Sequence, residues 1–175
     1  MRRLNHLPAG EDRQALLACC ASTRWVDRML SQRPFKDANE VFDAATRIWN
    51  DLGREDWLEA FAAHPRIGEE KPSNRDDRSN RDKVEGSKWA AEEQAGMRQA
   101  DDALQSAMAQ ANRDYEAKFG WIYLVCATGR SAEELLDLAR RRLTNEPDEE
   151  LTVAAAEQDR ITRLRIEKLL AIGDR

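Results

Sequence analysis

The chain has 175 residues, the size of one ordinary domain, and its formal net charge of −5 at pH 7 argues against nucleic acid or an anionic membrane as the main partner. Charged residues make up 35% of the chain, alanine, leucine, glutamate and arginine dominate, and valine and isoleucine are few. This balance favours helices with charged outer faces over a sheet, and no apolar run of about 18 residues is present that could span a bilayer.

The first 64 residues contain four stretches in which apolar residues recur at three- and four-residue steps, the pattern of amphipathic helices. We expect helices over 11–20, from a cap at Ser22 to near Pro34, from about 38 to 52 with Gly53 closing the run, and from about 55 to His64. The last of these should stop at His64 because Pro65 disfavours helical geometry in the residue before it.

The segment from about Glu69 to Gly86 is almost wholly polar, which predicts a long loop that is either functional, for instance a lid, or a tolerated surface insertion. From about Ser87 we expect a long helix that continues or restarts as far as Gly120. Its buried stripe would contain Trp89, Ala100, Leu104, Ala107, Met108 and Ala111.

The apolar run from Trp121 to Ala127 is predicted to be helical or irregular, because a lone strand would have no partner elsewhere in this sequence. Ser131 opens a further helix with a capping box, and the last helix runs from about Asp148 to Ile172. The basic triplet at 140–142 suits the solvated end of a helix. The predicted fold is all-α, a single domain of residues 1–175 built as a bundle of about seven to eight helices.

The three cysteines, Cys19, Cys20 and Cys126, are odd in number and form no Cys-x-x-Cys pair, which argues against a disulfide framework or a cysteine zinc site. A reducing compartment follows as the default. The N-terminus lacks the apolar core of a signal peptide. We therefore expect a cytoplasmic protein with no membrane attachment.

Three ionisable residues occur at positions that continue the buried apolar face of a predicted helix. His64 follows Phe61 by three residues, Glu93 follows Trp89 by four, and Arg165 follows Ile161 by four. Burying such a group costs several kcal/mol unless it is paired, so three inward residues from different helices could meet in one polar pocket.

Each of the three also has an ordinary structural interpretation. A histidine near a helix end often caps or packs, a glutamate can lie at the edge of a stripe, and an inward arginine can snorkel or form a structural ion pair. Together they suit proton transfer near neutrality on a small anion, with the histidine as acid or base and the arginine as anion binder. Metal chemistry is poorly supported, since His6 is the only other histidine, and no nucleotide-binding or hydrolase motif occurs.

Several segments, in this order, resemble the 2-oxo-4-hydroxy-4-carboxy-5-ureidoimidazoline (OHCU) decarboxylase family across essentially the whole chain. They are His64-Pro-Arg-Ile-Gly-Glu69, Glu93-Gln-Ala-Gly96, Asn112 to Gly120, the apolar run to Ala127, Arg142-Leu-Thr-Asn145, and Ile161 with Arg165. The resemblance implies an all-helical enzyme without a cofactor or metal, usually a homodimer, that completes uric acid breakdown to (S)-allantoin.

The resemblance also implies roles for individual residues. His64 and Glu93 would be the catalytic residues, with His64 as the acid. Pro65 would lie beside the substrate, Glu93 and Gln94 would contact the ureido-imidazoline, and Arg165 would bind it. The backbone from Trp121 to Val125 would contact the ring. Ala90 stands where the family commonly has serine, so one side-chain hydrogen bond to the substrate is not expected here.

This chemistry agrees with the residues, since the ring can accept the electrons that loss of carbon dioxide leaves behind and no cofactor is needed as an electron sink. Two other functions stay open. One is a helical interaction module without catalysis, in which His64, Glu93 and Arg165 would point to separate surfaces. The other is a proton-transfer enzyme that acts on a related ureide.

Overall fold

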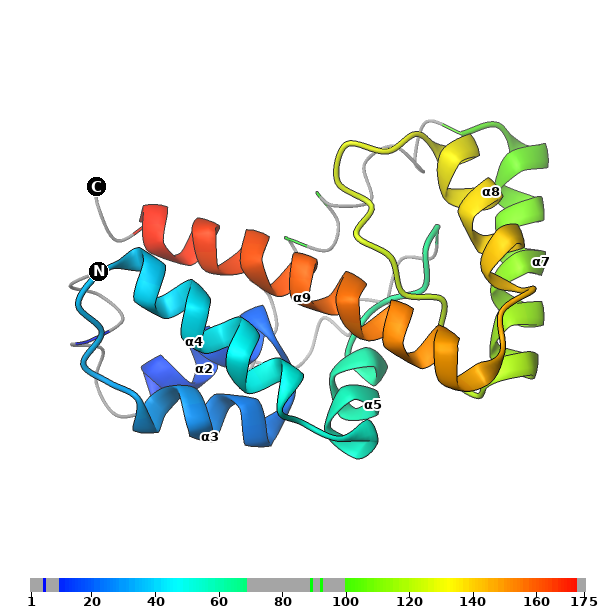
Figure 1. Ribbon diagram of the computed structural model, residues 1–175. Coiled ribbons are helices and arrows are strands. Elements are labelled where there is room, and N and C mark those ends of the chain that lie inside the picture. Colours follow the sequence, from blue (N-terminus) through cyan, green and yellow to red (C-terminus); the bar gives the residue numbers. More distant parts are fainter. Residues whose placement is uncertain (1–4, 6–9, 69–88, 90–91, 93–99, 173–175) are drawn as a thin grey trace. The chain divides into compact units, whose positions relative to one another are not determined.

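The structure is a computed structural model that describes residues 5, 10–68, 89, 92 and 100–172 (Figure 1). Within these residues the regular secondary structure is helical, which confirms the predicted all-α fold. Seven helices have described bounds: α2 Glu11–Cys19, α3 Thr23–Ser31, α4 Ala38–Asn50, α5 Arg54–Ala62, α7 Asp102–Phe119, α8 Ala132–Arg142 and α9 Pro147–Ile172. In the described part of the chain no helix is both long and apolar enough to cross a membrane.

The chain divides into two compact units whose boundaries fall within α5 and α9. The first unit comprises Met1–Ala60 and Gln158–Arg175, and the second comprises Phe61–Glu157. The single domain expected from chain length stays a prediction.

The first unit is built on α2, α3 and α4, which contact one another in chain order. Ser22 caps α3, as predicted, by accepting a hydrogen bond from the Trp25 N–H. Trp25 is fully buried and its indole donates to the Ala45 carbonyl of α4 at 3.1 Å. The helical periodicity of α4 is confirmed, although the helix ends at Asn50 rather than at Leu52.

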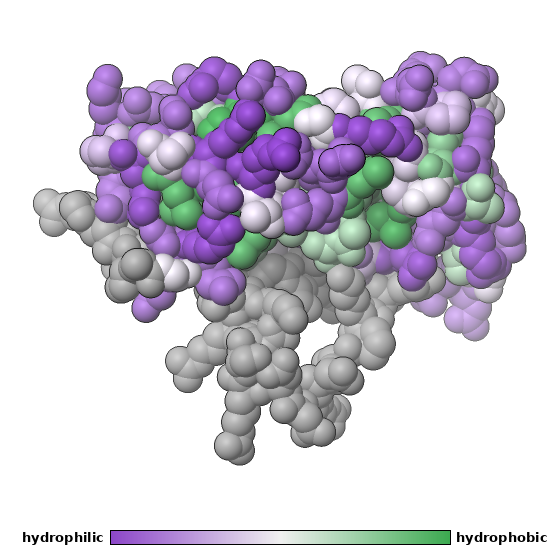
Figure 2. All heavy atoms as spheres, turned by 90° about the horizontal axis from the view of Figure 1, so that it is seen from below, coloured by the Kyte–Doolittle hydropathy of each residue, from purple (hydrophilic) through white to green (hydrophobic). Residues whose placement is uncertain are grey.

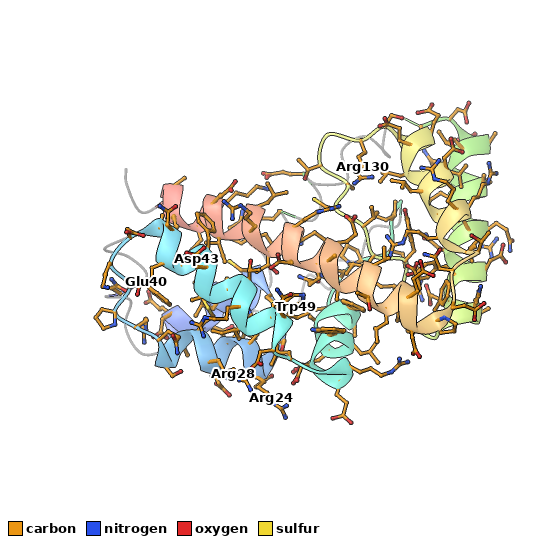
Figure 3. The ribbon with its side chains drawn as sticks, in the orientation of Figure 1. Arg24, Arg28, Glu40, Asp43, Trp49 and Arg130 are labelled. Carbon is orange, nitrogen blue, oxygen red and sulfur yellow. The ribbon has the colours of Figure 1, made fainter. Side chains whose placement is uncertain are left out.

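The outer faces of the helices are charged, as composition predicted. Hydrophilic residues prevail over the face drawn in Figure 2. Arg24 and Arg28 project from α3 (Figure 3), where Arg24 pairs with Asp56 at 3.2 Å and Arg28 with Asp51 at 2.7 Å. The side chains of Arg28 and Asp51 are both exposed, and such a pair contributes little to stability, whereas Asp56 is buried.

In the second unit α7 packs along α8 (Figure 1). The capping box at Ser131 is confirmed: its hydroxyl accepts from the Glu134 N–H, and the Glu134 carboxylate accepts from the Ser131 N–H. Gly120 ends α7 with φ of 83°, a left-handed conformation that favours glycine.

The predicted long helix from Ser87, with one stripe from Trp89 to Ala111, is wrong at Ala100, where the helical pattern is interrupted. Residues 89 and 92 are helical, but Ala100 lies in a bend and Asp101 caps a new helix by accepting from the Leu104 N–H at 2.8 Å. A new helix therefore begins at α7, because the Asp101 side chain caps its first turn. Apolar spacing alone would have predicted a continuous helix here.

Candidate functional site

The residues that carry His64 lie directly beyond α5, in the second unit. The helix ends at Ala62, in agreement with the stop predicted from Pro65, and the His64 N–H donates to the Phe61 carbonyl at 3.1 Å. Both His64 and Pro65 are half-buried, whereas Phe61 is fully buried. The imidazole therefore belongs to a tight turn anchored in the core.

Helix α7 holds this turn in place through two side chains. The Asn112 amide, which is buried, donates to the Ile67 carbonyl at 2.9 Å. One turn further on, both oxygens of Glu116 accept from the Arg66 guanidinium, at 2.5 and 2.8 Å. A bidentate pair of this kind fixes orientation as well as distance, so the chain after His64 is tied to α7 at both Arg66 and Ile67.

The segment from Trp121 to Ala127 is irregular, as predicted, and buried except for Ile122 and Cys126, which are partly exposed. Side chains from α8 and α9 hold its backbone. Arg142 donates to the Leu124 carbonyl at 2.8 Å, and Glu157 accepts from the Cys126 N–H at 2.9 Å. Glu157 also lies 3.9 Å from the guanidinium of Arg130, which is labelled in Figure 3.

Arg142 belongs to a buried polar cluster with Glu150 and Tyr115. Glu150 has no exposed surface, and its Oε1 accepts from Arg142 Nε at 2.7 Å and from the Tyr115 hydroxyl. Asn145 donates to the second carboxylate oxygen at 2.7 Å. Burying a charge is costly unless it is paired and hydrogen-bonded, and both conditions are met here.

The electrostatics of this cluster follow from burial and pairing. Burial by itself lowers the pKa of Arg142, but the hydrogen bond and charge of Glu150 outweigh it and raise that pKa above its ordinary value. Burial also raises the pKa of Tyr115 above its usual range, and that of Tyr123 to about 12. Both phenols are therefore neutral donors at physiological pH.

Arg142 corrects the prediction that the triplet at 140–142 is solvated. Arg140 and Arg141 are exposed as expected, whereas Arg142 is only 7% exposed. It lies seven residues after Leu135 and three after Ala139, which are both buried. The helical spacing that places His64 on an apolar face also places Arg142 on one. It likewise places Asn112, four residues after Met108, on the buried face of α7.

Arg165 lies in the first unit and is buried on α9, which confirms the inward direction predicted from its spacing to Ile161. Its guanidinium donates to the Ala18 carbonyl in the last turn of α2 at 3.3 Å. Burial raises the pKa of the neighbouring Cys20 thiol to about 12, although the positive charge of Arg165 acts in the opposite direction.

Ala90, Glu93, Gln94 and the predicted loop from Glu69 to Gly86 lie outside the described residues. Because the helical pattern breaks at Ala100, the predicted stripe of Trp89, in which Glu93 falls, is not continuous with that of α7. That His64, Glu93 and Arg165 share one pocket stays a prediction.

The sequence profile of the OHCU decarboxylase family matches residues 5–167. The chain is 37% identical over 163 residues to the "Uric acid degradation bifunctional protein TTL" of Arabidopsis thaliana, an alignment that covers 93% of this chain and 48% of the plant protein. It is 26% identical over 143 residues to the 2-oxo-4-hydroxy-4-carboxy-5-ureidoimidazoline decarboxylase of Haloferax volcanii, covering 81% and 79% of the two chains. The chain thus spans about half the length of the plant relative.

Solved structures show the same similarity. The crystal structure of OHCU decarboxylase in the presence of (S)-allantoin superposes with a TM-score of 0.74 and 33% identity, over 90% of this chain and 98% of that one. A crystal structure of (S)-allantoin synthase shares the fold with a TM-score of 0.68, at 15% identity, over 95% of this chain and 52% of that one.

Proposed function

Because the chain belongs to the OHCU decarboxylase family, we propose that it decarboxylates 2-oxo-4-hydroxy-4-carboxy-5-ureidoimidazoline to (S)-allantoin, the last step of uric acid degradation. The family match over residues 5–167 carries the proposal. The similarity to a solved OHCU decarboxylase over nearly all of that chain supports it.

In the proposed mechanism His64 supplies a proton or assists loss of the carboxylate. An imidazole has an ordinary pKa near neutrality and can donate or accept a proton there. Two observations support this role. The His64 side chain is half-buried rather than solvated, and Asn112 and Glu116 fix the turn that bears it. Positioning of this kind lets one face of a flat intermediate be protonated, which a single enantiomer of product requires.

The remaining substrate contacts are proposed from the family resemblance. Glu93 and Gln94 hold the ureido arm, Pro65 lies against the ring, and Arg165 binds a carbonyl or the carboxylate. The buried position of Arg165 on α9 supports the last role, because a guanidinium in a low-dielectric setting binds an anion more strongly than one in water. Ala90 itself lacks the hydroxyl that the family commonly has at this position.

The backbone from Trp121 to Val125 is proposed to contact the ring. The reaction itself needs no cofactor or metal in this proposal. The electrons of the broken carbon–carbon bond move into the conjugated ring, which takes the part that a bound electron sink plays in other decarboxylases.

Assembly and location are also part of the proposal. We infer a cytoplasmic homodimer that acts on a small molecule, from the family resemblance and from the three cysteines, which are thiols and not disulfides. Sedimentation equilibrium of the purified chain tests the dimer.

The decisive experiment supplies freshly made substrate, produced from urate by the two preceding enzymes, and follows optical activity. Rapid formation of (S)-allantoin that depends on this protein is the expected result. Substitution His64→Ala should lower kcat by about 10²–10⁴-fold, the usual contribution of a positioned acid, while His6→Ala serves as the control of the same residue type. A His64→Ala variant as fast as wild type would refute the role of His64, and turnover of a related ureide alone would favour the alternative substrate.

A further inference from the structure

Three polar residues lie on the buried face of α9, at positions where helical spacing would place apolar side chains. Gln158, Thr162 and Arg165 follow one another at steps of four and three residues and are 0%, 3% and 6% exposed. Seven residues are nearly two helical turns, so the side chains of Gln158 and Arg165 leave α9 in nearly the same direction. Burying polar groups is costly unless they are hydrogen-bonded, so the partners of these side chains indicate what this face does.

One end of the Gln158 carboxamide has no partner in the part of the chain that the structure describes. Its Nε2 donates to the Thr162 hydroxyl at 3.1 Å, whereas its buried Oε1 accepts no hydrogen bond from any described residue. The Thr162 hydroxyl in turn hydrogen-bonds the buried Cys20 thiol, whose sulfur also accepts from the Ser22 N–H. Because the hydroxyl proton is directed to Cys20, the hydroxyl oxygen is the acceptor for Nε2, and Oε1 is the end of the amide that can bind another donor.

The Oε1 atom supplies the chemistry that Arg165 lacks. A guanidinium has only donors, so it can bind the carbonyl or carboxylate oxygens of a ligand but not its N–H groups. A ureido-imidazoline carries both kinds of group, since its urea units contain N–H donors beside carbonyl oxygens. Buried side-chain acceptors are nearly always paired in folded proteins. An unpaired carboxamide oxygen on the face that bears Arg165 is therefore suited to an N–H of such a ligand.

We propose that Gln158 is a further substrate-binding residue, whose Oε1 accepts a hydrogen bond from a urea-type N–H of the ureido-imidazoline while Thr162 fixes the orientation of its amide. This inference rests on the proposed function and on the role proposed there for Arg165. Thr162 is a positioning residue in this arrangement, because its hydroxyl is engaged by Gln158 and Cys20 and does not bind the substrate.

The test compares Gln158→Met with Ile166→Val in the full chain. Methionine has a length close to that of glutamine but no oxygen acceptor. Ile166 is fully buried on α9 and has no polar side-chain atom, so its variant controls for repacking of the same helix. Titration calorimetry with (S)-allantoin, the proposed product, measures binding without turnover. For Gln158→Met we expect the dissociation constant and KM to rise about tenfold, as for a ligand donor left unpaired, with the pH profile of kcat retained. Ile166→Val should bind like wild type.

Thr162 allows a separate test of the amide orientation. Thr162→Val keeps the shape of the side chain but removes the hydroxyl that holds Nε2, so it should weaken binding of (S)-allantoin, though less than Gln158→Met does. Thr162→Ser retains the hydroxyl and should recover most of that loss. Equal dissociation constants for Thr162→Val and Thr162→Ser would contradict the positioning role.

Stability separates ligand binding from a purely structural role of Gln158. The unliganded Gln158→Met protein should unfold at a urea midpoint no lower than that of Ile166→Val, because the substitution removes a buried acceptor that has no partner among the described residues. A Gln158→Met variant that binds (S)-allantoin like wild type would overturn the inference, and a lower urea midpoint would then assign Gln158 to the core. A wild-type protein that neither binds nor forms (S)-allantoin would instead refute the proposed function, and this inference with it.

Discussion

The side-chain amide of Asn112 donates to the Ile67 carbonyl three residues beyond His64, at a site where both residues are at most 4% exposed. This hydrogen bond joins the middle of α7 to the turn that bears the proposed acid. It offers a direct way to perturb the position of His64 without altering the imidazole.

We expect Asn112→Ala to lower the free energy of unfolding by about 1–3 kcal/mol, because the Ile67 carbonyl would stay buried without its donor. It should also lower kcat. Glu116→Ala is the matched control on the same helix. It removes a partly exposed ion pair to Arg66, with 45% and 28% of the two side chains accessible, so its effect on unfolding should be below about 1 kcal/mol. Urea denaturation of the two variants measures the difference, and equal losses would contradict it.

Gly120 provides a test of the helix end at α7. With φ of 83°, an alanine there would adopt a left-handed conformation at a cost of about 1–2 kcal/mol. A Cβ at this position meets no described atom within 4 Å, so the cost comes from the backbone alone. Gly120→Asn should be less destabilising than Gly120→Ala, because asparagine tolerates this conformation better. Thermal unfolding that ranks the two variants in the opposite order would contradict this explanation.

Asp159 in α9 makes stability depend on pH. Burial raises the pKa of this carboxyl above its ordinary value of 3.8, although a hydrogen bond from Thr46 and the charge of Arg163 act in the opposite direction. A carboxyl whose folded pKa is raised favours the folded state in acid, and that contribution is lost as pH rises through the folded pKa.

Asp159→Asn should therefore increase the free energy of unfolding at pH 7, since the amide oxygen can still accept from Thr46 and no charge is buried. The gain should shrink as pH falls and vanish below the ordinary pKa of 3.8. Chemical denaturation at a series of pH values measures it. A gain that is the same at pH 3 and pH 7 would show that titration of Asp159 is not its cause.

The three thiols should differ in reactivity towards iodoacetamide at pH 8. Cys19 and Cys20 are fully buried, and burial raises the pKa of Cys20 to about 12, so Cys20 is not a thiolate at that pH. Cys126 is only half-buried and should be alkylated first. Peptide mass spectrometry of the native protein identifies the modified site, and all three thiols should react in urea. Early labelling of Cys20 would contradict its described burial.

Helical periodicity predicted most of this fold because apolar spacing and local caps act over a few residues. The stripe of α4 and the caps at Ser22 and Ser131 were both visible in the sequence and are present in the structure. The interruption at Ala100 was missed because Ala100 fits the apolar stripe, while the capping side chain of Asp101 decides where the new helix begins.

The candidate site was only partly predictable, for a different physical reason. Phase analysis placed Arg165 correctly, since burial on one helix face follows from spacing. The same spacing holds for Arg142, but three arginines at a helix end suggest solvent exposure. The burial of Arg142 depends on Glu150, which comes from the next helix and whose pairing no local pattern displays.

The buried Arg142–Glu150 pair also bears on how this protein can be made more heat-stable. Replacing a buried ion pair by well-packed apolar residues of similar volume is often neutral or stabilising. A selection for thermostability alone would therefore tend to discard the pair, and with it the fixed Leu124 carbonyl. Heat tolerance and the proposed activity would then favour different residues at positions 142 and 150, so libraries selected for stability should keep both positions constant.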